Sequence, residues 1–213
     1  MKKSLFTMLI SLSALSLGTS AQAALAPGDD FAYTNEQFAD IQMLRYKVEG
    51  FEKLSLRQKT LIYHLSEAAL AGRDILFDQN GRYNLRIRRM LETVYTQYRG
   101  DRNSKDFREL TTYLKRVWFA SGIHHHYGSE KFQPGFSEKW LRQTLADLNY
   151  SLDEEIFPVI FNPEVMPMRV NQKDGDDLIL TSAENYYGPG VTQAEAEEFY
   201  TQRKAVNDPH PIM

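Results

Sequence analysis

The sequence contains no cysteine. This absence excludes disulfide bonds, thiol nucleophiles and zinc sites with cysteine ligands. The sequence also lacks a G-x-S-x-G nucleophile elbow, a G-x-G-x-x-G or P-loop glycine motif, and any histidine that is followed by glutamate. Judged from its residues alone, the chain therefore carries no recognisable catalytic set.

The first residues have the pattern of a secretory signal. Lys2 and Lys3 precede an apolar run over residues 5–17, and Ala21 and Ala23 supply small residues where a signal peptidase reads them. The apolar run is too short for a helix that crosses about 30 Å of hydrocarbon. We predict a signal peptide over residues 1–23, cut after Ala23, and a periplasmic or extracellular protein without a membrane span. An N-terminal anchor or a core helix is the alternative.

The charge balance limits the classes of partner. The chain has 25 basic and 28 acidic residues, a formal net charge of −3 that becomes more negative once Lys2 and Lys3 are removed. A mildly acidic protein is a poor match for nucleic acid or an anionic membrane surface. We therefore expect neither as a partner, and the sequence leaves the oligomeric state open.

Most of the chain up to residue 150 has helical periodicity. Apolar residues recur at steps of three and four, which is typical of one helix face. The pattern predicts helices over residues 38–48, 55–80, 85–100, 107–122 and 137–148. Ser55 and Gln58 have the spacing of a capping box, and Ser137 is expected to cap the fifth helix.

After residue 150 the pattern changes. Strand-like runs at residues 165–170 and 178–181 flank the turn sequence KDGD, which predicts a β hairpin. Thr192 and Glu195 form a second capping box, opening a helix to about residue 204. The expected fold class is α+β, mainly α: a helical region over 24–150, then a mixed part of the same lobe over 151–213. Two strands alone are marginally stable, so the hairpin is expected to need strands from outside an incomplete chain.

Three consecutive histidines, His124, His125 and His126, are the most unusual feature. Imidazole is a common metal ligand, but neighbouring side chains point in different directions, and paired helical ligands are three or four residues apart. We therefore expect no metal site here. We expect a loop after the fourth helix with His126 or Tyr127 accessible, in which alanine at all three histidines changes stability little. Both a plain polar loop and a substrate-contacting loop remain open.

Two segments resemble the dipeptidyl peptidase III family, zinc exopeptidases that release dipeptides from the N-termini of oligopeptides. Residues 122–134, GIHHHYGSEKFQP, are similar to a family stretch that ends in Gly-x-x-Lys-Phe-x-Pro, with matches at Gly128, Lys131, Phe132 and Pro134. Residues 185–196, NYYGPGVTQAEA, are similar to a family segment in which an aromatic pair and a glycine turn precede a threonine at the start of an acidic helix.

The resemblance implies a zinc cofactor for the full-length enzyme, but its His-Glu-x-x-x-His motif is absent here. It therefore implies an inactive N-terminal part, belonging to the lobe opposite the zinc lobe, which binds no zinc itself and whose hairpin belongs to a larger β-barrel lobe. In this reading His126, Tyr127, Tyr186 and Tyr187 contact the oligopeptide substrate, since they can hydrogen-bond a backbone and stack on side chains. Core packing is the alternative for the tyrosines. The competing functional hypothesis is a complete, non-catalytic exported module that binds peptides or a partner protein.

Overall fold

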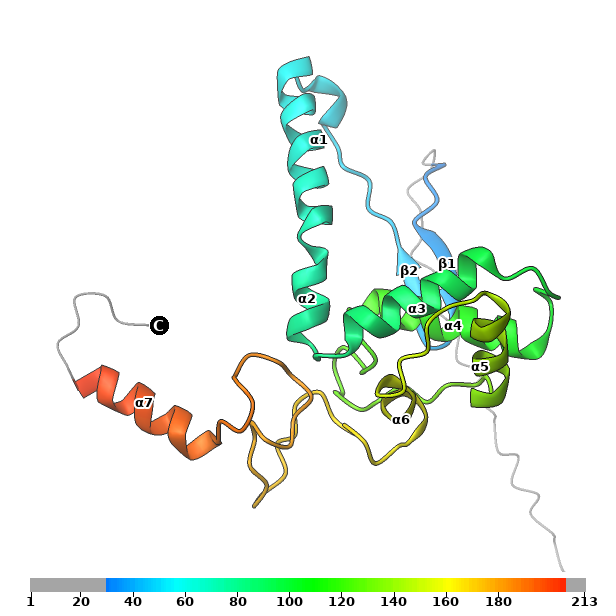
Figure 1. The fold of residues 1–213 in the computed structure, drawn as a ribbon. Helices are drawn as coiled ribbons and strands as arrows, with labels where there is room; N and C mark the ends of the chain where they lie inside the picture. The colour runs from blue at the N-terminus through cyan, green and yellow to red at the C-terminus, as the bar shows by residue number, and fades with distance from the viewer. Residues whose placement is uncertain (1–29, 206–213) are drawn as a thin grey trace, which may run out of the picture.

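The computed structural model describes residues 30–205 as a mainly helical protein with one antiparallel hairpin before the helices (Figure 1). The predicted signal peptide lies outside the described residues. In chain order the elements are β1 (Thr34–Phe38), β2 (Ile41–Leu44), a 3₁₀ turn (Phe51–Lys53), α1 (Leu56–Ala71), α2 (Arg73–Gln79), α3 (Asn84–Gln97), α4 (Lys105–Ala120), α5 (Glu138–Asp147), α6 (Ile156–Phe161) and α7 (Gln193–Ala205). Within this part of the chain, no helix has the length and apolar character that a bilayer crossing requires.

Helices α3 to α6 supply most of one hydrophobic core. The buried positions of α4 recur at steps of three and four, as the sequence predicts. Fully buried side chains from the four helices include Ile87, Leu91, Leu110, Leu114, Leu141, Leu145, Phe157 and Ile160. The helices predicted at 85–100, 107–122 and 137–148 are thus confirmed.

The expected helix caps are also confirmed. Ser55 and Gln58 form a complete capping box at the start of α1. The Ser137 hydroxyl accepts from the amide of Trp140 at 3.2 Å. At α7 the amide of Glu195 donates to the Thr192 hydroxyl at 3.2 Å, while the amide of Thr192 donates back to the Glu195 carboxylate at 2.8 Å.

The predicted helix over residues 38–48 is wrong, because residues 34–44 form the β1–β2 hairpin and residues 45–48 lie in neither a helix nor a strand. Phe38 pairs with Ile41 across a two-residue turn in which Ala39 has φ 50°. Cross-strand neighbours share one face of a hairpin, so two apolar residues flanking such a turn show the same spacing of three as a helix face. The ring centroid of Phe38 lies 6.5 Å from that of Phe119 on α4, and the buried Ile41 shares this face.

The hairpin predicted at residues 165–170 and 178–181 is also wrong. The first segment pairs instead with the loop after α4: Arg169 N donates to Ser129 O at 2.8 Å, and Lys131 N donates to Pro167 O at 3.0 Å. The second segment coils into a turn, because the Asp177 carboxylate accepts from the amides of Ile179 and Leu180, each at 2.9 Å. Local capping by an aspartate therefore replaces strand pairing. The described hairpin precedes the helices rather than following them.

Helices α1 and α2 form an arm that projects from the core (Figure 1). Gly72 joins them in a right-handed helical conformation, and its amide donates to Ala68 O at 3.1 Å. No residue of α1 is buried, and α2 buries only Phe77. The predicted 55–80 helix is therefore confirmed with one interruption, but its large apolar residues other than Phe77 face solvent.

Candidate functional site

The loop after α4 is held by two asparagines from the α2–α3 junction. The Asn80 side-chain amide donates to Ala120 O at 3.3 Å and to Ser121 O at 3.2 Å. The buried Asn84 accepts from the amide of Ile123 at 3.3 Å through its Oδ1. Because carbonyls at a helix C-terminus lack partners within the helix, these contacts stabilise the end of α4 and fix where the histidine loop begins.

The three histidines have three different surroundings. The buried His124 places its Nε2 2.8 Å from Met166 O, and because a carbonyl only accepts, that nitrogen carries a hydrogen. Burial lowers the pKa of His124 to about 4, so the ring is neutral at pH 7. His125 Nδ1 accepts from the amide of Gly128 at 2.9 Å and closes the turn.

His126 is the histidine that lies among exposed aromatic rings. Its ring centroid is 4.8 Å from that of Phe119 and 4.3 Å from that of Tyr127. Tyr127 is 87% exposed, which confirms that this part of the loop is accessible. Burial lowers the pKa of His126, and the neighbouring His125 adds to this effect.

The expectation that alanine is tolerated at all three histidines is contradicted for His124. Its side chain is 3% exposed and holds the carbonyl of Met166, so its removal leaves both a cavity and an unpaired acceptor. Since the three rings point to separate partners, they do not form a tetrahedral set. Among residues 30–205 no group of three or more histidines and carboxylates is placed to hold a metal ion, so these side chains do not fit a zinc site.

The residues that carry the family-like pattern in this loop serve the scaffold. Lys131 is buried, and its ammonium donates to Val159 O at 3.0 Å and to the carbonyls of Asn162 and Val165. One side chain thereby satisfies carbonyls in and just after the last turn of α6. Phe132 is buried in the core. Lys131 therefore fixes the loop to the end of α6, and Phe132 anchors the loop in the core.

Arg169 connects the two segments that were predicted to contact substrate. Its Nη2 donates to His126 O at 3.4 Å, and its Nε lies 3.7 Å from the carboxylate of Glu184. Burial raises the pKa of Glu184, and the positive charge of Arg169 opposes this effect. Reasoning from the sequence missed both residues, because they are 15 positions apart in irregular segments where no periodicity marks a pair.

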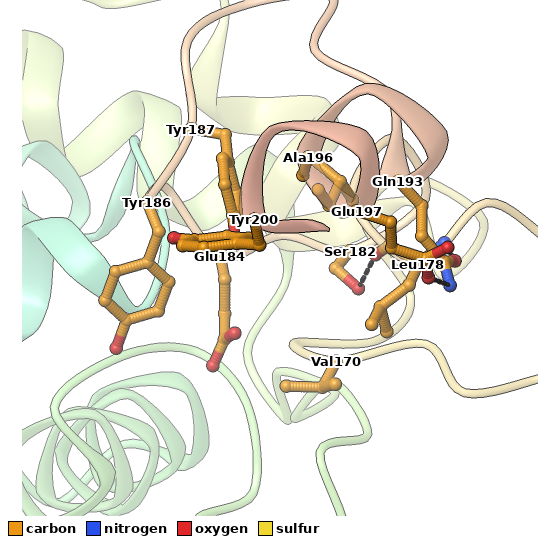
Figure 2. A pocket seen from close by; sticks show the side chains of 11 residues that line it. Val170, Leu178, Ser182, Glu184, Tyr186, Tyr187, Gln193, Ala196, Glu197 and Tyr200 are labelled. Carbon is orange, nitrogen blue, oxygen red and sulfur yellow. Dashed lines mark hydrogen bonds between the residues drawn. The ribbon is translucent and has the colours of Figure 1, made fainter. Parts of the chain in front are cut away.

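Beyond Glu184 lies a pocket of about 600 Å³ between α7 and the preceding irregular segment. Figure 2 shows the side chains that line it, which are Val170, Leu178, Ile179, Ser182, Glu184, Tyr186, Tyr187, Gln193, Ala196, Glu197 and Tyr200. A hydrogen bond with Tyr200 raises the pKa of Tyr187. Tyr186 and Tyr187 line this pocket, whereas His126 and Tyr127 lie outside it. The four predicted contact residues thus fall into two pairs, linked through Arg169.

Comparison with known protein families and with curated proteins finds no match. The arrangement itself combines exposed aromatic rings, hydroxyl groups and carboxylates on two segments that Arg169 links. Such groups bind ligands by stacking and hydrogen bonding.

Proposed function

We propose that this chain is a non-catalytic, substrate-facing part of an exported zinc peptidase that resembles dipeptidyl peptidase III. It supplies one wall of a cleft that binds oligopeptides, and the zinc ligands come from polypeptide outside this sequence. The protein works in the periplasm or outside the cell. The likeness of residues 122–134 and 185–196 to that family supports the proposal.

The observation that carries the proposal is the exposed apolar arm. Eight large apolar residues of α1 and α2 are at least 40% exposed: Leu56, Leu61, Ile62, Tyr63, Leu65, Leu70, Ile75 and Leu76. At 100° per residue they are spread over most of the helix circumference rather than along one stripe. Although α1 also carries Arg57, Lys59 and Glu67, so many large exposed apolar side chains on two neighbouring helices are typical of a surface that another part of a protein covers. The exposed arm therefore supports the proposal that this chain is part of a larger protein, in which other residues cover α1 and α2.

Within such an enzyme this part would bind and orient the peptide. Tyr127 presents its hydroxyl to solvent, and the ring of His126 packs beside it. Tyr186 and Tyr187 add two more rings at the pocket. These groups can donate to a peptide backbone and stack on its side chains. When bound in the complete enzyme, zinc would polarise the scissile carbonyl and activate a water molecule.

The test compares two products of the same gene locus. The 213-residue chain should release no dipeptide from a chromogenic dipeptide substrate, with or without added zinc. A longer product that carries His-Glu-x-x-x-His should release dipeptides, lose this activity with a chelator and regain it with zinc. Chelator-sensitive activity in the short chain, or a longer reading frame without the motif, would overturn the proposal.

A complete binding module is the second candidate, and the closed core of α3 to α6 favours it. Several of its side chains are fully buried, so this part has the core of a self-sufficient domain. The module predicts a monodisperse species that melts cooperatively and reversibly. The peptidase part predicts association through the exposed arm, because large apolar patches are rare on monomers. Light scattering together with thermal unfolding separates the two.

A further inference from the structure

We propose that the arm formed by α1 and α2 is a dimerisation element, which pairs in the antiparallel direction with the arm of a second copy of this chain. The pairing does not depend on the proposed function, because it uses only residues of the 213-residue chain. Three features of the arm support it: the order of the residues along one side, a glycine that the fold of the single chain does not require, and the exposed apolar area.

One side of the arm has the spacing of a coiled-coil face. Its members are Leu61, Ile62, Leu65, Ala68, Ala69, Gly72, Ile75 and Leu76, which we call the pairing face. Leu61, Leu65, Ala68, Gly72 and Ile75 follow one another at steps of four and three, which is the heptad rhythm of two packed helices. At 100° per residue the eight positions fall within about 140° of the helix circumference. Between residues 60 and 72 the only aspartate, glutamate, lysine or arginine is Glu67, which lies on the opposite side.

The order of residues on the pairing face reads almost the same in both directions. Large residues stand at its two ends, and small residues stand in the middle. An antiparallel pair centred between Ala68 and Ala69 sets Leu61 level with the partner's Leu76, Ile62 with the partner's Ile75, Leu65 with the partner's Gly72, and Ala68 with the partner's Ala69. A two-fold interface uses the same patch on both copies and therefore has to match itself in this way.

Gly72 is explained by such a partner. It has φ −77° and ψ −7°, a right-handed helical conformation that any residue adopts. A Cβ at this position would meet only Ala69 O at 3.6 Å and Ala68 O at 3.8 Å, which are ordinary contact distances. Neither the backbone nor the packing of the single chain requires glycine here, although glycine is unfavourable in a helix. In the pair, the missing side chain leaves a hole that the partner's Leu65 can fill.

The exposed apolar area is sufficient for a small specific interface. The five large residues of the pairing face are between 40% and 61% exposed, and no residue of α1 is buried. These fractions amount to roughly 500 Å² of apolar surface per copy and roughly 1,000 Å² for the pair, which reaches the lower end of specific interfaces. The arm also projects from the core, so a second arm can lie along it (Figure 1).

Cysteine cross-linking tests the pairing directly, because the chain has no cysteine of its own. Ala69→Cys should form a disulfide-linked dimer on oxidation, since Ala69 lies next to the centre of the pair. Leu61→Cys should not link to itself, because its two copies would be about 22 Å apart along the helices. A mixture of Leu61→Cys and Leu76→Cys should link. Self-linking of Leu61→Cys at the rate of Ala69→Cys would show parallel arms and overturn the proposal.

Two matched controls separate specific pairing from general stickiness. Ala71→Cys introduces the same side chain two residues further along the arm but off the pairing face, and it should link at least tenfold more slowly than Ala69→Cys. Gly72→Leu fills the hole for the partner's Leu65 and should weaken the dimer at least tenfold, whereas Ala71→Leu should leave it unchanged. Circular dichroism verifies the fold of each variant, and light scattering at about 1–100 μM measures the dimer. A chain that stays monomeric throughout, or equal linking of Ala71→Cys and Ala69→Cys, would overturn the proposal.

The outcome is separate from the catalytic test. The pattern of cross-links in the 213-residue chain decides the pairing whether or not a longer product releases dipeptides. A longer product without the zinc motif would overturn the peptidase and leave the dimer unaffected.

Discussion

The buried His124 makes the stability of this protein sensitive to mild acid. Its pKa is lowered from 6.5 to about 4, first by burial, and the positive charges of Lys131 and Arg169 act in the same direction. The unfolded chain therefore takes up a proton below pH 6.5 that the folded chain resists until about pH 4. Stability contributed by the neutral ring is fully present above pH 6.5 and is lost as the pH falls through this window.

The loss of unfolding free energy follows from the difference between the pKa of His124 in the unfolded and in the folded chain. One pKa unit corresponds to about 1.4 kcal/mol, so the full window amounts to about 3 kcal/mol. Between pH 7.5 and pH 4.5 the free energy of unfolding should fall by about 2–3 kcal/mol from this group alone. Urea unfolding followed by circular dichroism at pH steps across this range measures the change.

The variant His124→Gln isolates the contribution, because glutamine does not titrate and its amide can still donate to Met166 O. Carboxylates with lowered pKa values, such as Asp40 and Asp177, also contribute in acid, but they are common to both proteins and cancel in the difference. The variant should be less stable at pH 7.5 and nearly as stable as the parent at pH 4.5. Parallel pH curves for the two proteins would refute the neutral, buried state of His124.

Three further changes test the scaffold and the arm. Lys131→Met keeps the length of the side chain but removes the donor to three carbonyls, and should cost about 3 kcal/mol or more in urea unfolding; a cost below 1 kcal/mol would contradict its capping role. Gly122→Ala places a Cβ 2.5 Å from Asn84 Nδ2, and should lower stability by about 1–3 kcal/mol because Asn84 is buried; an unchanged melting temperature would argue against this close approach. Leu65→Gln changes a side chain that is 60% exposed, and should reduce self-association in light scattering while altering stability by only about 0.5 kcal/mol; a large loss of stability would mean that the arm packs against the chain itself.

Sequence reasoning succeeded where the local signal and the tertiary environment agree. Helices α3, α4 and α5 each bury one periodic face. The starts of α4 and α5 are set by Ser104 and Ser137, whose hydroxyls accept from amides three positions further on. Such contacts can be read from spacing alone.

Predictions from the sequence were wrong where contacts between residues far apart in the chain determine the local structure. Phe38 and Ile41 have helical spacing, yet α4 selects the hairpin through Phe119. The segment around Met168 has strand character, but its partner is the loop at Glu130, far earlier in the chain. In the candidate site, the exposure of Tyr127 could be predicted, because Gly122 and Gly128 on either side of it indicate a loop. The burial of His124 could not be predicted, because it depends on a contact with Met166, which is 42 positions away.

The β1–β2 hairpin has a consequence for the order in which the chain folds. Its ion pairs join Glu36 to Lys115 and Asp40 to Arg116, residues 79 and 76 positions apart. A two-stranded hairpin is at best marginally stable alone, and contacts between distant positions form slowly because a long loop must close first. The hairpin is therefore expected to form only after α4 has folded. Although it comes first in the described chain, it completes the fold late, and its amides should exchange with solvent before those of α3 and α4.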